Sequence, residues 1–267
     1  MTSGNGKPTA TSKGREIVLK TNKVTIRFGG LTAVKELDMA VAVGEIYGLI
    51  GPNGAGKTTI FNLLTGVYEP TSGEIYFEER RIDGKRPYEI SRCGVSRTFQ
   101  NIRLFPGMTV LENVMTACHI HARQNLFDAV VRSPRFERDE REHRDFSLEL
   151  LDIFDLADSR DEGGTSLPYG KQRRLEIVRA LATRPKLLLL DEPAAGLNPS
   201  EQEDLMLLIQ QIRDRFGLTI LLVEHNMKVV MGVCERIQVV DYGKSIALGV
   251  PDEIKNDPKV IEAYLGD

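Results

Sequence analysis

The stretch EIYGLIGPNGAGKTTIFNLLTG, residues 45–66, decides the fold of this chain. An apolar run leads into Gly51-Pro-Asn-Gly-Ala-Gly-Lys57-Thr58, and a helix-like segment, residues 59–66, follows. The middle part is a complete G-x-x-x-x-G-K-[ST] motif in a strand-to-helix context. Its glycines let successive backbone N–H groups curl around a phosphate, and the positive end of the helix dipole adds to the attraction. The sequence therefore predicts a phosphate-binding loop.

Two side chains of this loop have predicted roles in binding a nucleoside triphosphate. Lys57 reaches the β and γ phosphates, and the Thr58 hydroxyl is a ligand for Mg²⁺. We therefore expect the chain to bind and hydrolyse ATP with Mg²⁺. The candidate ATP-binding residues of the loop are Gly51, Pro52, Asn53, Gly54, Ala55, Gly56, Lys57, Thr58 and Thr59.

A second apolar run, LLLL at residues 187–190, ends in two acids, Asp191 and Glu192. Parallel strands deliver such residues to the edge of the sheet where ligands bind. Asp191 is predicted to hold Mg²⁺ through its water shell, and Glu192 to polarise the attacking water as general base. A helix N-cap role for one of the acids is the structural alternative.

The patterns around these motifs predict an α/β fold. Residues 17–28 and 33–51 alternate apolar and polar positions between glycine-containing turns, which is typical of half-buried antiparallel strands. Residues 187–190 are all apolar and residues 218–223 are apolar except for Thr219, as in strands buried on both faces of a mostly parallel sheet. Residues 236–249 predict two strands joined by a turn at Asp241 to Lys244. The expected fold is a P-loop NTPase core with an antiparallel β layer.

Helical periodicity predicts an inserted helical subdomain at about residues 93–180. Its charge-dense stretch, residues 132–156, is expected to be a solvated helix face. Residues 1–16 have almost nothing to bury and predict a disordered tail. One ATPase domain is expected over residues 17–250, followed by a short C-terminal extension, residues 251–267.

Composition restricts the function. Of the 267 residues, 41% are apolar and 27% charged, as in soluble globular proteins, and the net charge of -3 gives no reason to expect nucleic acid as a partner. Three well-separated cysteines suggest neither disulfides nor a zinc site. No stretch approaches the roughly 18 apolar residues of a membrane span, so work at a membrane would require docking on another protein.

Six motifs, in their order along the chain, resemble those of the ATP-binding subunits of ABC transporters. The resemblance covers essentially everything after Ile17. Several longer stretches, GVSRTFQNIRLFPGMTVLENV, GKQRRLEIVRAL and the ending AYLG among them, resemble the ATPases of branched-chain amino acid importers, of the subunit type with the longer helical insert. The motifs that carry the resemblance are the loop at residues 51–58, RTFQ with Gln100, LPYGKQRRLE at residues 167–176, LLLLDEP, AAGLN at residues 194–198 and VEHNM with His225.

The resemblance implies roles for three further residues. Phe28 would stack on adenine, Gln100 would contact Mg²⁺ and the attacking water, and His225 would bond the γ-phosphate and position Glu192. Taken alone, Phe28 suits the core of the β layer equally well, Gln100 is an ordinary exposed polar residue, and a single histidine after a strand is usually structural.

The family's signature segment would bind the ATP held by an opposite subunit, so that two cassettes close head to tail around two ATP molecules. This chain departs from the usual L-S-G-G-Q pattern, since Pro168 replaces the serine. Proline lacks the hydroxyl and the N–H of serine, although its fixed φ suits the first turn of a helix. Ala195 and Asn198, in a segment that usually reads S-A-L-D, are the expected dimer contacts. The candidate signature residues are Leu167, Pro168, Tyr169, Gly170, Lys171 and Gln172.

The resemblance also implies the partners. These are integral-membrane permeases, a second cassette that we expect to be a different chain, and indirectly a substrate-binding protein. The location would be peripheral, on the cytoplasmic face of the inner (plasma) membrane of a bacterium or archaeon. The alternatives are a soluble ABC ATPase of DNA repair or translation, which shares the motifs but typically carries coiled-coil insertions or two cassettes, and a simple P-loop kinase, which has no use for His225.

Overall fold

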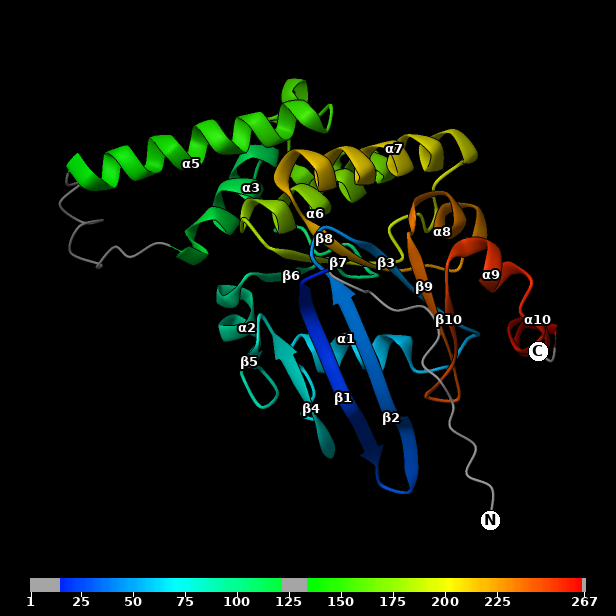
Figure 1. Ribbon diagram of the computed structural model, residues 1–267. Helices are drawn as coiled ribbons and strands as arrows, with labels where there is room; N and C mark the ends of the chain where they lie inside the picture. The colour runs from blue at the N-terminus through cyan, green and yellow to red at the C-terminus, as the bar shows by residue number, and fades with distance from the viewer. Residues whose placement is uncertain (1–14, 122–133, 266–267) are drawn as a thin grey trace, which may run out of the picture.

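The computed structural model describes residues 15–121 and 134–265, and two sheets organise this part of the chain (Figure 1). The smaller sheet is antiparallel, with the spatial order β2-β1-β4-β5. The expected β layer is therefore present. Its strands are β1 (Ile17–Phe28), β2 (Leu31–Ala42), β4 (Ser72–Phe77) and β5 (Arg80–Arg81).

The larger sheet is mostly parallel, with the order β10-β9-β3-β8-β7-β6. β3 lies between β8 and β9 and is parallel to both, and within the described part of this sheet only β10 runs antiparallel to its neighbour. Its strands are β3 (Ile46–Ile50), β6 (Val95–Arg97), β7 (Leu187–Asp191), β8 (Thr219–Val223), β9 (Arg236–Asp241) and β10 (Lys244–Gly249). The strand, turn and strand predicted at residues 236–249 are confirmed.

The sequence interpretation was wrong about the last part of residues 33–51. Residues 46–50 form β3, which belongs to the parallel sheet and not to the antiparallel layer, and all of its residues are buried. The glycine at position 48 and the glutamate at position 45 interrupt the apolar run and imitate the alternation of a half-buried strand. The strand that carries the phosphate-binding loop is in fact central to the core.

Helices connect the strands; α3, α5, α6, α7 and α8 cover the parallel sheet on the side opposite the β layer, while α1 lies between the two sheets and α2 packs on the β-layer side (Figure 1). The helices are α1 (Lys57–Leu64), α2 (Pro87–Cys93), α3 (Val110–Cys118), α5 (Pro134–Ile153), α6 (Tyr169–Ala182), α7 (Pro199–Phe216), α8 (Met227–Val233), α9 (Pro251–Lys255) and α10 (Pro258–Leu265). Short 3-10 turns lie at His119–His121, Ala157–Ser159 and Gly164–Ser166.

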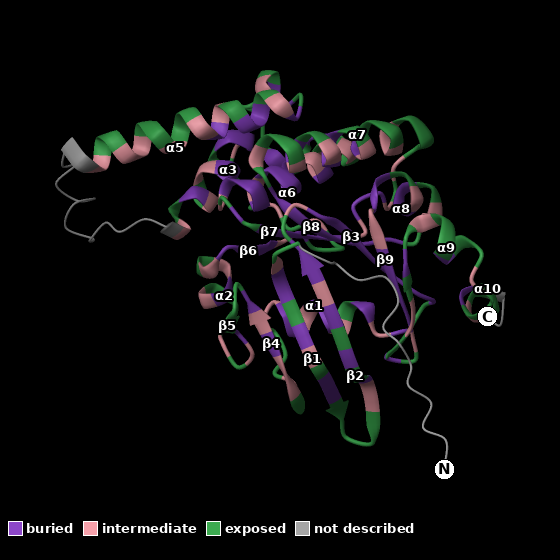
Figure 2. Ribbon diagram, in the orientation of Figure 1, coloured by how far each residue is buried: buried purple, intermediate pink, exposed green. Residues whose placement is uncertain are grey.

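The apolar run of β7 is buried on both faces, as its sequence predicts (Figure 2). Leu187 and Leu189 pack with α1 and the antiparallel strands, whereas Leu188 and Leu190 pack with the helices on the other face. Because successive side chains of a strand point to opposite faces, a strand between two cores must be apolar at every position. The parallel sheet is thus packed on both faces.

The helical subdomain begins later than the sequence suggested. Residues 95–97 form β6, which pairs in parallel with β7, so they belong to the sheet and not to a helical region starting near residue 93. A strand of this length is too short to show the two-residue period. Helices α3, α5 and the first part of α6 then form the helical arm.

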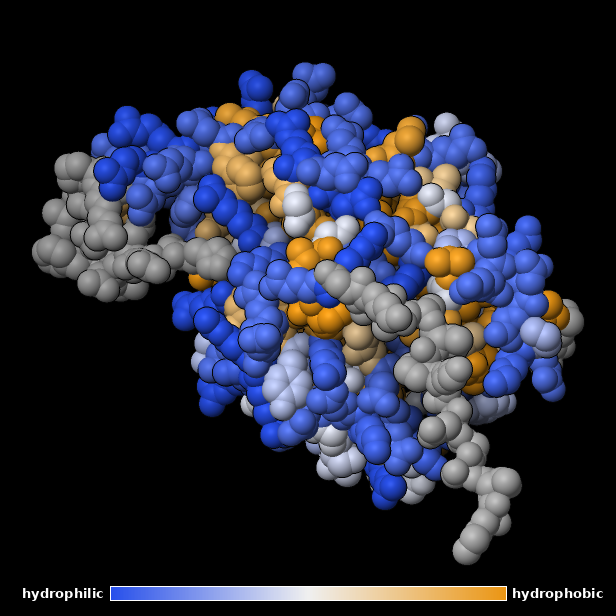
Figure 3. All heavy atoms as spheres, in the orientation of Figure 1, coloured by the Kyte–Doolittle hydropathy of each residue, from blue (hydrophilic) through white to orange (hydrophobic). Residues whose placement is uncertain are grey.

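The charged stretch lies on the outside of this arm, as predicted. Most described residues of α5 before Phe146 are exposed or half-buried, and the surface over α5 is largely hydrophilic (Figure 3). Ser147, Leu150 and Leu151 face the core instead. The helix therefore has one buried face near its C-terminal end and a solvated remainder.

The ends of the described part of the chain lie near the predicted tail and the predicted C-terminal extension. Residues 1–14 of the predicted tail lie outside the described residues, but Arg15 and Glu16 are held: Arg15 pairs with Glu235, and the Glu16 carbonyl accepts from the Val43 N–H. At the other end, α9 and α10 form the C-terminal extension. Over residues 15–121 and 134–265, no helix combines the length and the apolar character needed to cross a membrane.

Candidate nucleotide-binding and hydrolysis site

The phosphate-binding loop joins β3 to α1, and two of its glycines are required by geometry. Gly51 has φ +156°, and a Cβ atom there would lie 2.0 Å from the Val240 carbonyl oxygen. Gly56, the N-cap of α1, has φ +103°, and a Cβ atom there would lie 2.7 Å from the Ala33 oxygen. Only glycine tolerates this combination of positive φ and close backbone approach. The loop is thus shaped by its glycines to present backbone groups.

Lys57, the first residue of α1, folds back over the loop. Its Nζ donates to the carbonyl oxygens of Gly51 at 2.6 Å and Pro52 at 2.7 Å, and the side chain is buried. Burial lowers the pKa of the ammonium group, while the carboxylates of Glu192 and Asp191 oppose that effect. The lysine is a buried cation aimed along the inside of the loop, as phosphate binding requires.

The loop forms one wall of a cleft of about 600 Å³. Three of the predicted site residues, Gln100, Glu192 and His225, form the facing wall. They lie after β6, β7 and β8, which end at the same edge of the parallel sheet. The loop residues that line the cleft are Asn53, Gly54, Ala55, Gly56, Lys57, Thr58 and Thr59.

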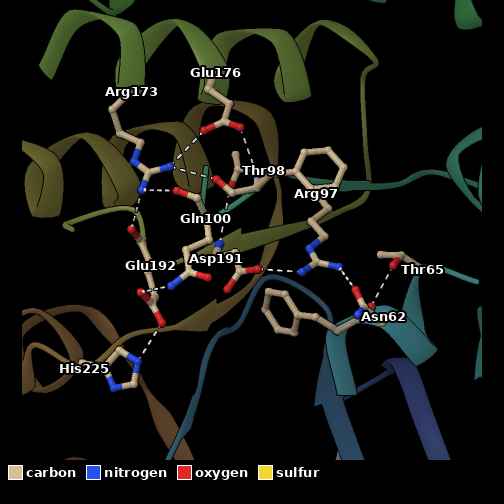
Figure 4. A network of polar contacts seen from close by, with 12 residues as sticks. Asn62, Thr65, Arg97, Thr98, Gln100, Arg173, Glu176, Asp191, Glu192 and His225 are labelled. Atoms are coloured by element: carbon tan, nitrogen blue, oxygen red, sulfur yellow. Dashed lines mark hydrogen bonds and ion pairs between the residues drawn. The ribbon is translucent and has the colours of Figure 1, made fainter. Parts of the chain in front are cut away.

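The Glu192 carboxylate is held at both oxygens (Figure 4). Gln100 Nε2 donates to Oε2 at 2.9 Å, and His225 Nε2 lies 2.6 Å from Oε1. The backbone of Glu192 has φ +48°, in the left-handed region that residues other than glycine rarely adopt. Its N–H donates to the Val223 carbonyl oxygen at 2.8 Å. A carboxylate fixed in this way at the mouth of the cleft suits a general base.

Asp191, the last residue of β7, does not line the cleft directly. Its Oδ2 pairs with Arg97 Nη2 at 2.6 Å, and both side chains are nearly buried. Arg97 also donates to Asn62 Oδ1 at 2.6 Å, and its guanidinium lies against the rings of Phe61 and Phe99. Our sequence interpretation had not identified Arg97, although it stands in the same SRTFQ segment as Gln100.

One further carboxylate and one ion pair escaped the sequence interpretation because they are buried under the site. Glu224 accepts from the N–H groups of Ala194 at 2.6 Å and His225 at 3.1 Å, and its burial raises the pKa of its carboxyl group. It stands directly before His225 in VEHNM, which is the only signal that the sequence offers. The other group is an ion pair between Arg173 and Glu176 in α6.

Phe28 lies apart from the cleft lining, at the end of β1. Its ring is 44% exposed and meets the Tyr68 ring edge to face, with the centroids 5.2 Å apart. The alternative that it fills the core of the β layer is therefore wrong. An exposed aromatic face of this kind is suited to stacking on a base.

The signature segment, residues 167–172, forms the turn into α6 and lies outside the cleft lining. Pro168 is the N-cap of α6, with φ -53° and ψ 149°. It therefore lies just before the first turn of the helix, whereas the sequence suggested a position within that turn. Lys171 Nζ donates to Ser159 Oγ at 3.2 Å, which turns its charge toward the helical arm. Gln172 Nε2 donates to the Leu167 oxygen at 2.7 Å. Tyr169 and Gly170 begin the helix.

Ala195 and Asn198 lie in the turn between β7 and α7. The Tyr169 hydroxyl donates to the Ala195 oxygen at 3.2 Å, and a Cβ atom on Gly196 would lie 2.9 Å from the Tyr169 ring. Asn198 caps α7 by accepting from the Glu201 N–H at 3.0 Å. The signature segment and the AAGLN segment are therefore in contact within this chain.

The residues of the cleft fit ATP and Mg²⁺. The volume is that of a small-ligand site, the loop supplies positive groups, and hydroxyl, amide and carboxylate oxygens are the ligands that Mg²⁺ prefers. Thr58 and Gln100 line the cleft, and Asp191 lies one residue from Glu192 at the same edge. When bound, the ion would neutralise charge on the phosphates.

Comparison with known proteins agrees with this geometry. The family described as ABC transporter matches residues 34–195, and the family described as Branched-chain amino acid ATP-binding cassette transporter matches residues 244–267. The high-affinity branched-chain amino acid transport ATP-binding protein LivG of Salmonella typhimurium is 48% identical over 250 residues, covering 94% of this chain and 98% of LivG.

Solved structures give the same result. The ADP conformation of MJ1267, an ATP-binding cassette of an ABC transporter, has a TM-score of 0.82 and 30% identity, covering 94% of this chain and 99% of that one. A dimeric post-hydrolysis structure of the cassette MJ0796, bound to ADP and Pi, has a TM-score of 0.73 and 26% identity, covering 87% and 98%. The alternative of a soluble ABC ATPase of DNA repair or translation is not favoured. This chain belongs to the ABC transporter family, as an ATP-hydrolysing cassette of the branched-chain amino acid type.

Proposed function

We propose that this cassette powers the uptake of branched-chain or closely related amino acids through membrane permeases, on the cytoplasmic face of the plasma membrane. The observation that carries the proposal is the assembly of Gln100, Glu192 and His225 opposite the loop at residues 51–58. The substrate class rests on the similarity to LivG and on the family match at residues 244–267.

The predicted site residues have the following roles in this proposal. Lys57 and the loop N–H groups hold the phosphates, and Phe28 stacks on the adenine. Glu192 accepts the proton of the attacking water. His225 and Gln100 keep its carboxylate oriented, and Thr58, Gln100 and Asp191 hold Mg²⁺. The contact between Asp191 and Arg97 supports a water-mediated role for this aspartate, since one of its oxygens is already occupied.

Dimer closure is the proposed source of the transport movement. Residues 167–172, with Ala195 and Asn198, would meet ATP held on the loop of a second cassette. The similar cassette MJ0796 has been solved as a dimer bound to ADP and Pi, which supports dimerisation. Pro168 would weaken the contact between this signature segment and the ATP of the second cassette. We therefore propose that the natural second cassette is a different chain with a serine in its signature. Movement of the segment around Gln100 would transmit the closing of the dimer to the permeases.

The test is amino acid uptake in a bacterial strain whose gene for this chain is deleted and then restored in native or Glu192→Gln form. We expect uptake of labelled leucine, isoleucine and valine to depend on the native gene and to be absent with Glu192→Gln. Lysine uptake serves as the control and should not change. Branched-chain uptake that persists after deletion would refute the proposed substrate class.

A further inference from the structure

Helix α6 carries a buried ion pair that none of the motifs predicts. Arg173 Nη1 lies 3.0 Å from Glu176 Oε2, three residues later on the same helix. The two side chains are only 2% and 4% exposed, and Arg173 is among the largest fully buried side chains of the described residues. Because burying a charge is costly even when it is paired, such a pair calls for a reason beyond packing.

The pair bonds to the backbone of both segments that carry the catalytic side chains (Figure 4). Arg173 Nη1 donates to the Phe99 oxygen at 2.8 Å, and Nη2 donates to the Gln100 oxygen at 3.0 Å and to the Glu192 oxygen at 3.1 Å. Glu176 Oε1 accepts from the Phe99 N–H at 3.1 Å. One guanidinium group thus joins α6 to the segment after β6 and to the residue after β7.

This arrangement suits arginine and no other residue. The planar guanidinium presents its N–H groups in a fixed fork, so carbonyl oxygens that bond to it are held at a fixed separation. Glu176 fixes the plane of the fork and at the same time binds the Phe99 N–H. Lysine carries the same charge, but its single ammonium group has no planar fork to bridge carbonyls from two segments.

Glu192 is the residue that most needs such support. Its φ of +48° is unfavourable for a residue with a side chain, and a residue persists in that conformation only when its surroundings determine it. Its N–H bonds to Val223, and its carbonyl oxygen bonds to Arg173. The two bonds hold the peptide groups on either side of the Cα atom from which the carboxylate projects into the cleft.

We propose that Arg173, braced by Glu176, is a positioning residue for ATP hydrolysis, which sets Gln100 and Glu192 relative to each other from behind the site. The inference deepens the proposed function, because it assumes that Glu192 and Gln100 act on the attacking water. Arg173 contacts only the backbone oxygens of Gln100 and Glu192, and it lies outside the lining of the cleft. We therefore expect its removal to lower the rate of hydrolysis, while ATP affinity, which rests on the loop, α1 and Phe28, stays near the native value.

The primary test is Arg173→Lys, which keeps a positive charge beside Glu176 and so avoids leaving a buried carboxylate unpaired. We expect the ATP dissociation constant from calorimetry, and KM, to stay near native values, while kcat falls by about tenfold or more, as for a misplaced catalytic group. The neighbouring Arg174→Met is the matched control. Arg174 is partly exposed, pairs with Asp155 and Asp204, and should keep native kcat.

A second variant separates positioning from folding. Arg173→Met with Glu176→Met replaces the whole pair by apolar side chains, a change that is often neutral for stability. We expect a melting temperature near the native value and a kcat as low as that of Arg173→Lys. If both variants hydrolyse ATP within about twofold of the native rate, the inference is overturned.

The same assay must include Glu192→Gln so that two failures can be told apart. If Glu192→Gln turns over ATP at the native rate, the proposed catalytic role of Glu192 is wrong, and the inference fails with it. If Glu192→Gln is inactive while both Arg173 variants keep native kcat, only the inference is refuted.

Discussion

His225 Nε2 lies 2.6 Å from Glu192 Oε1, although the two residues follow different strands. Gln100 occupies the other carboxylate oxygen from a third strand. Because β6, β7 and β8 are adjacent and parallel, their ends bring these side chains to one edge of a sheet that is packed on both faces. The geometry favours Glu192 as the base and His225 as the residue that orients it.

The loop gives the first prediction. Lys57→Ala should abolish useful ATP binding, because Lys57 is the cation buried within the phosphate loop and charge-assisted contacts are the strong ones. Calorimetric titration with MgATP is the measurement. An unchanged dissociation constant would rule out the phosphate-binding role of this lysine.

The second prediction concerns adenine. Phe28→Ala should weaken ATP binding by about 1 to 3 kcal/mol, the usual value of stacking a base on an aromatic ring. Phe28→Tyr keeps an aromatic face and should bind as the native chain does, which makes it the control. Equal affinities of all three chains for ATP would show that adenine rests elsewhere.

The third prediction concerns the altered signature. Pro168 offers neither a hydroxyl nor an N–H to a γ-phosphate, and Lys171 is bonded to Ser159 in this structure. The loss of one charge-assisted hydrogen bond should weaken ATP-driven closure by about 1.5 to 3 kcal/mol per site. We therefore expect Glu192→Gln with MgATP to remain a monomer in sedimentation, and to dimerise when Pro168→Ser is added. A tight homodimer of the Glu192→Gln chain at low micromolar concentration would contradict this.

The sequence predicts most directly the parts of the site that local chemistry determines. The loop needs glycines at fixed positions, and an acid after an apolar strand must lie at the edge of the sheet. Strand ends and the family resemblance therefore predict that Glu192 and His225 lie near the loop. The resemblance also predicts that His225 positions Glu192, whereas the bond from Gln100 to Glu192 required the structure, since it depends on the order of the strands.

Other features had no local signal. Residues 95–97 pair with β7 over too few positions for a period to be visible, and β3 imitates a half-buried strand. Arg173 bonds to backbone oxygens of residues far along the chain, and no side-chain pattern records such partners. Buried charged residues that bond to distant backbone groups are therefore the hardest to predict from a sequence.

The most direct measurement is phosphate release from MgATP by the native chain and by Glu192→Gln, with nucleotide affinity measured on both. The amide keeps the shape of the side chain but cannot accept a proton as a base does, so we predict native ATP affinity and a turnover lower by at least about two orders of magnitude. Phosphate release by Glu192→Gln at the native rate would contradict the account, and His225 would then be the next candidate for the base.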